Sequence, residues 1–104
     1  MAQLRITGER RAGEELQVEL GYSQTLPVEV EVECRLKRGD EVLERIGAGR
    51  IPANPGGSPE ATPVVGSLFF PLRIEEGGEY RVVCFTVVDE GNKLSQAISI
   101  GAAE

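Results

Sequence analysis

The chain has 104 residues, of which 40% are hydrophobic and 27% charged, and its formal net charge at pH 7 is −6. This balance is typical of one soluble globular domain, residues 1–104, and not of a disordered chain. The acidic charge disfavours binding to nucleic acid or to anionic membrane surfaces, and no apolar run approaches the roughly 20 residues that span a bilayer.

Apolar and polar residues alternate along most of the chain, and turn signals separate the alternating segments. The pattern predicts seven strands, at residues 2–7, 14–22, 27–38, 41–46 or a little beyond, 64–72, 79–88 and 93–100. The third segment alternates most cleanly, since its even positions from Val28 to Leu36 are apolar and its odd positions from Glu29 to Lys37 are charged. Successive side chains of a strand point to opposite faces, so one face of this strand is expected in the core.

The segments between the strands carry distinct turn signals. Gly39-Asp40 predicts a tight hairpin, and Gly47-Ala48-Gly49-Arg50 predicts a bulge or the end of a strand. Residues 52–63 contain four prolines and form the longest irregular stretch. Pro71 suits an edge strand because it cannot donate a ladder hydrogen bond, and residues 89–92 are expected to be the last turn. Short strands with short links predict an all-β, two-sheet antiparallel sandwich.

The segment from Glu76 to Cys84, EGGEYRVVC, resembles the corner that precedes the sixth strand of immunoglobulin-like domains, a group taken broadly to include the fibronectin type III domains. The resemblance implies an immunoglobulin-like Greek key of about seven strands. It also implies that the hydroxyl of Tyr80 bonds back to the backbone and closes the corner. The chain departs from antibody domains, because it has no tryptophan and no cysteine in its second strand.

Two cysteines, Cys34 and Cys84, fall in the third and sixth predicted strands. Those strands are neighbours in an immunoglobulin-like sandwich, so the two side chains could face each other and form a disulfide. The favoured interpretation is two buried free thiols, because the first residues carry no signal-peptide pattern and cytosolic thiols stay reduced. The expected location is the cytoplasm if the chain is complete and the extracellular space if it is an excised domain.

Catalytic and metal chemistry have little support. Histidine is absent, which removes the commonest general base and metal ligand, and the serines therefore lack an activating partner. Two cysteines cannot supply the four ligands of a structural zinc site. The single turn at 89–92 offers too few oxygen ligands for calcium. We therefore expect no catalytic residues, no metal and no cofactor.

Two surfaces are candidates for binding. One is the end of the sandwich at which the loops 22–27, 52–63 and 89–92 should meet, since successive antiparallel strands alternate in direction. The other is the second face of the sixth strand, where either choice of core face leaves apolar residues outward. The candidates at the loop end are Pro55, Gly56, Gly57, Asp89, Glu90 and Asn92. The candidates on the sheet face are Val83, Phe85, Val87 and Ala97.

These features together predict a non-enzymatic protein-binding or spacer module. The expected partner is another protein, and a homodimer is one form of it. One alternative is a regulatory or inhibitory domain that occludes an enzyme with the loop 52–63. Another alternative is a carbohydrate- or calcium-binding accessory module, which the small number of aromatic residues disfavours.

Overall fold

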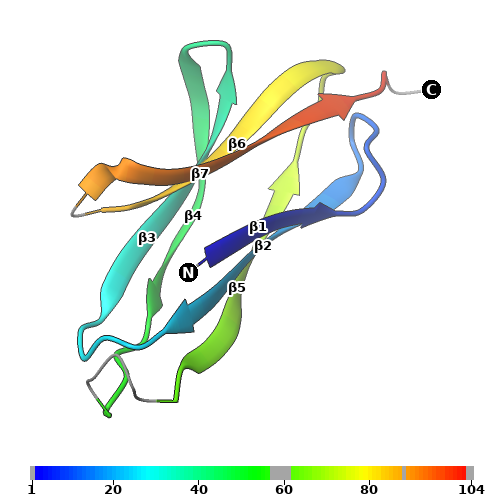
Figure 1. The fold of residues 1–104 in the computed structure, drawn as a ribbon. Coiled ribbons are helices and arrows are strands. Elements are labelled where there is room, and N and C mark those ends of the chain that lie inside the picture. Colours follow the sequence, from blue (N-terminus) through cyan, green and yellow to red (C-terminus); the bar gives the residue numbers. More distant parts are fainter. Residues whose placement is uncertain (1, 57–61, 88, 103–104) are drawn as a thin grey trace.

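The computed structural model describes residues 2–56, 62–87 and 89–102, and describes residues 89–92 by their backbone alone. These residues form an all-β sandwich of two antiparallel sheets (Figure 1). One sheet has the strand order β1-β2-β5, and the other has the order β4-β3-β6-β7. The strands are β1 (Ala2–Thr7), β2 (Glu15–Gln24), β3 (Val30–Arg38), β4 (Glu41–Ile51), β5 (Val64–Arg73), β6 (Gly78–Thr86) and β7 (Asp89–Ile100).

The core lies between the two sheets and is made by alternate residues of each strand. In β2, Leu16, Val18 and Leu20 are almost fully buried, and the residues between them face outward. In β6, Tyr80, Val82 and Cys84 belong to the core cluster. This settles the core face of the sixth strand, which the sequence pattern left open.

Strand β3 begins at Val30, three residues later than predicted. The alternation does extend back to Val28, but the side-chain amide of Gln24 donates a hydrogen bond to the Val28 carbonyl at 2.9 Å. Pro27 also lacks an N–H to donate to a neighbouring strand. Residues 25–29 therefore form a loop in which Val28 is exposed.

Strand β4 runs to Ile51, further than the predicted strand, which ended at residue 46 or a little beyond. Its glycines do not end the strand, because they allow close packing between the two sheets. A Cβ atom on Gly47 would lie 2.4 Å from Cδ1 of Phe70, which belongs to β5 in the other sheet. At the start of β4, Arg38 pairs with Glu41, so the predicted two-residue hairpin at Gly39-Asp40 is confirmed.

The predicted turn at 89–92 is wrong, because β7 already begins at Asp89. Thr86 pairs with Asp89, and Phe85 pairs with Lys93. The register therefore shifts by three residues on β7 at this point, and residues 90–92 form an irregularity within the strand. A glycine in this segment marks such an irregularity as readily as it marks a turn.

The edges of the sheets follow from the strand order. Strand β5, which contains Pro71, is an edge strand as predicted. Hydrogen bonds join the two sheets at the C-terminal end of β7, where Gly101 meets the segment between β1 and β2. The N–H of Ala12 donates to the Gly101 carbonyl at 2.8 Å, and the N–H of Gly101 donates to the Arg10 carbonyl at 2.9 Å. No helix in the described part of the chain is long and apolar enough to cross a membrane.

Candidate functional site

A tyrosine closes the corner before β6. The Tyr80 hydroxyl donates to the Glu76 carbonyl at 2.7 Å, which confirms the hydrogen bond expected of this residue. The same hydroxyl accepts a hydrogen bond from the Arg38 guanidinium, whose central carbon lies 4.6 Å from the centre of the Tyr80 ring. This corner is structural, because it ties the approach to β6 onto the end of β3.

Cys34 and Cys84 lie directly opposite each other on β3 and β6. The structure joins them in a disulfide and leaves neither as a free thiol, contrary to the favoured interpretation of the sequence. Both residues are buried, with exposed fractions of 0% and 2%. The pairing of the third strand with the sixth brings two core-facing side chains together, so the bond is an internal brace of the four-stranded sheet.

The sheet-face candidates lie outward, but half of the set is covered. Phe85 is only 7% exposed, because the Arg35 guanidinium stacks over its ring with 4.6 Å between the guanidinium carbon and the ring centre. Val83 is also nearly buried, whereas Ala97 is exposed. Val87 is exposed too, but its predicted place on the sheet face is wrong, because β6 ends at Thr86 and Val87 lies just beyond it. The long side chain of Arg35 thus covers the aromatic part of the expected apolar stripe. The face is not a bare hydrophobic patch.

The loop end is held together by two buried amides that the sequence analysis did not identify. Asn54, which is 3% exposed, donates from its side chain to the carbonyls of Gln24 at 3.0 Å and Thr62 at 2.8 Å. Its side-chain oxygen accepts from the N–H of Gly56 at 2.8 Å, and its own N–H donates to the Leu26 carbonyl at 2.9 Å. These bonds tie the loops after β2 and β4 to each other, which Figure 1 shows side by side at its lower left.

Gln24 completes this network from the other side. Its side-chain oxygen accepts from the N–H of Leu26 at 3.3 Å while its amide nitrogen holds Val28. The connection between β6 and β7 lies at the same end of the sandwich, because the N–H of Val87 donates to the Glu31 carbonyl, near the start of β3, at 2.9 Å. The only sequence signals for this network were a glutamine at the end of an alternating strand and an asparagine among prolines.

The fixed loops carry exposed apolar side chains. Leu26 is 51% exposed and Val28 is 52% exposed, and Val87 is similarly open to solvent. Of the candidates predicted at this end, Pro55 and Gly56 lie in the loop that Asn54 orders. Gly57 and the side chains of Asp89, Glu90 and Asn92 lie outside the described residues. The described loop end therefore offers exposed apolar side chains on loops that the hydrogen bonds of Gln24 and Asn54 hold in place.

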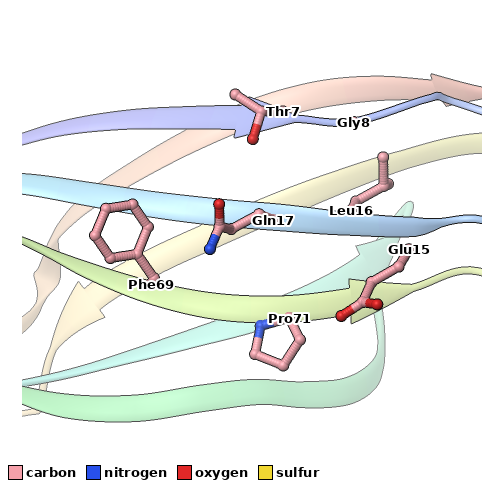
Figure 2. A pocket seen from close by; sticks show the side chains of 7 residues that line it. All are labelled: Thr7, Gly8, Glu15, Leu16, Gln17, Phe69 and Pro71. Carbon is pink, nitrogen blue, oxygen red and sulfur yellow. The ribbon is translucent and has the colours of Figure 1, made fainter.

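A shallow groove of about 350 Å³ lies on the outer face of the three-stranded sheet. Figure 2 shows the side chains of Thr7, Gln17, Phe69 and Pro71 along it. Among the described residues that line it, Glu15 alone is titratable, so these residues offer no pair of groups for acid–base chemistry. Among the residues that the structure describes, no three His, Cys, Asp or Glu side chains are close enough to hold a metal ion.

Comparison of the chain with models of known protein families finds no match, and comparison with curated protein sequences finds no significant similarity.

Proposed function

We propose that this chain is a non-enzymatic protein-binding module whose contact surface is the loop end, formed by residues 25–29, 52–56 and Val87. The observation that carries the proposal is the exposure of Leu26 and Val28 on a loop fixed by the buried amides of Gln24 and Asn54. Exposed apolar side chains mark contact surfaces when they are grouped. A loop that is already ordered loses less conformational entropy when a partner binds, which favours affinity.

We also propose that the sandwich is immunoglobulin-like in the broad sense. The hydrogen bond from Tyr80 to the backbone at the corner and the pairing of the third strand with the sixth support this relationship. Antibody constant domains place their fourth strand with the first, second and fifth, whereas β4 here pairs with β3. In variable domains the corresponding loop end is the recognition surface, which agrees with the proposed position of the site.

A capture experiment tests the loop end directly. The immobilised wild-type chain and a Leu26→Ser, Val28→Ser double variant would be exposed to the same extract of the source cells, and retained proteins compared by quantitative mass spectrometry. We expect a protein that the wild type retains and the double variant loses, since the substitutions remove the exposed apolar contacts. The unfolding curves of the wild type and the double variant should agree closely, because neither Leu26 nor Val28 belongs to the core.

Phe69→Ser is the matched control, since Phe69 is 54% exposed but lies opposite Glu19 on the outer face of the three-stranded sheet, away from the loop end. This variant should retain the partner. A partner that the wild type and the loop-end variant retain equally would refute the loop end as the contact surface. Loss of the partner in the Phe69→Ser variant alone would instead place the contact on the outer face of the three-stranded sheet.

A further inference from the structure

We propose that the outer face of β3 and β6 is a second binding surface, separate from the loop end, for an extended acidic segment of a partner protein. The surface consists of Arg35, Lys37, Arg81 and Lys93 around an apolar floor of Val83 and Phe85. It lies on a chain whose formal net charge is −6, so a group of four cations, three of which have no acidic partner among the described side chains, is contrary to the average composition.

The cross-strand register shows what this surface lacks. Arg35 lies directly opposite Arg45, and Glu33 neutralises that pair by contacting Arg35 and by lying 3.6 Å from the guanidinium of Arg45. Lys37 lies directly opposite Arg81 in the same sheet. Like charges in directly opposed positions destabilise a sheet unless an opposite charge intervenes.

Among the described side chains, no carboxylate neutralises Lys37 and Arg81 as Glu33 neutralises Arg35 and Arg45. Among the side chains that the structure describes, none forms an ion pair with Lys37, Arg81 or Lys93. Arg81 donates to the hydroxyl of Ser95 at 3.0 Å, and Glu79, the nearest acid on the same face of β6, accepts a hydrogen bond from Ser99 at 2.6 Å. An external carboxylate between Lys37 and Arg81 would supply the missing charge.

A depression beside this pair favours a peptide over a simple anion. Its lining consists of Arg35, Lys37, Val42, Val83, Phe85 and Lys93, and its volume is about 220 Å³. Among the described residues of this lining, all the titratable groups are cations and the others are apolar. An extended segment could place one apolar side chain in the depression and carboxylates beside Lys37 and Lys93. Because the lining between the cations is apolar, a peptide side chain fits the depression better than a phosphate group does.

The test uses a short fluorescein-labelled peptide with a central leucine flanked by glutamates, titrated at low salt and followed by fluorescence anisotropy. We expect binding that weakens with added salt and that disappears when glutamines replace the glutamates. A Lys37→Gln, Arg81→Gln double variant should bind about tenfold more weakly, the loss expected for two partly exposed ion pairs. The reversed variant, Lys37→Glu with Arg81→Glu, should prefer a peptide in which lysines replace the glutamates.

An Arg5→Gln, Arg73→Gln double variant is the control, because it has the same net charge but changes the outer face of the other sheet. Its affinity should equal that of the wild type. Equal weakening in the two double variants would overturn the proposal, since attraction to net charge alone would then explain binding. Failure of the acidic peptide to bind would overturn it too, as would binding of a single-stranded oligonucleotide through the same residues without binding of the peptide. None of these results depends on the loop end.

Discussion

At the scale of single residues, Asn54 supports more of the loop end than any other described side chain. Its amide makes three hydrogen bonds while almost fully buried. We expect Asn54→Ala to lower the free energy of unfolding by about 2–3 kcal/mol, because the carbonyls of Gln24 and Thr62 lose their donor. Urea unfolding measures this loss. Faster hydrogen exchange at the amide of Leu26 would show that the loop has been released, and unchanged exchange there would contradict the proposed frame.

Tyr80 is a second residue whose polar atom matters more than its ring. Tyr80→Phe keeps the buried ring but removes the hydroxyl that donates to Glu76 and accepts from Arg38. The expected loss of stability is about 1–2 kcal/mol. Tyr22→Phe is the control, and it should change the midpoint of urea unfolding far less, because Tyr22 is only partly buried in the core. Equal effects of the two substitutions would show that the corner hydrogen bond contributes nothing special.

At the scale of elements, the alternating pattern predicted all seven strands, most clearly where one face is buried and the other is outward, as in β2 and β3. The errors lie where a side chain or a neighbouring strand decides. The start of β3 depends on the Gln24 side chain, which holds Val28 in a loop. The length of β4 depends on the approach of the Phe70 ring from the other sheet. Neither contact can be seen in a pattern of hydrophobicity.

The candidate site was predicted less completely than the fold. Parity placed Val83 and Phe85 on the same face of the sixth strand, but it left open whether that face is the outer one, and it could not show that Arg35 covers the Phe85 ring. The loop end was predicted from the order of the strands alone. Its buried amides, Gln24 and Asn54, were missed because polar residues near loops are usually exposed.

The close approach of β4 and β5 makes a specific prediction. Gly47→Ala would place a methyl group against the Phe70 ring, and we expect the variant to be less stable by about 1–3 kcal/mol because the two sheets must separate or the ring must move. Gly21→Ala is the matched control in another strand, where the nearest atoms to a new Cβ would be 3.8 Å away. Thermal unfolding should distinguish the two variants. An unchanged melting temperature for Gly47→Ala would mean that the sheets adjust freely.

The disulfide between β3 and β6 leads to a second prediction at this scale. Cys34 and Cys84 are separated by 50 residues, so the bond should stabilise the fold by about 4 kcal/mol through the restricted unfolded chain. A Cys34→Ala, Cys84→Ala double variant should lose about that much, and a reducing agent should lower the unfolding midpoint of the wild type but not that of the variant. Mass spectrometry of the unreduced protein tests the bond itself, and two alkylated cysteines would contradict it.

At the scale of the whole molecule, the edge of the three-stranded sheet decides how the chain behaves at high concentration. Strand β5 is an edge strand whose outer face bears Val65 and Phe69, exposed by 75% and 54%, with only one proline to block pairing. An exposed apolar edge favours pairing with a second chain. We therefore expect weak, reversible self-association of the wild type, seen as a sedimentation coefficient that rises with concentration.

A Val65→Lys, Phe69→Lys double variant should remain monomeric over the same range, because lysines on an edge oppose pairing. A Val28→Lys, Val87→Lys double variant adds the same two cations to exposed valines at the loop end and serves as the control for charge. Self-association that the β5 variant keeps and the Val28→Lys, Val87→Lys variant abolishes would move the self-contact to the loop end. The surface proposed for a partner would then also bind a second copy of the chain.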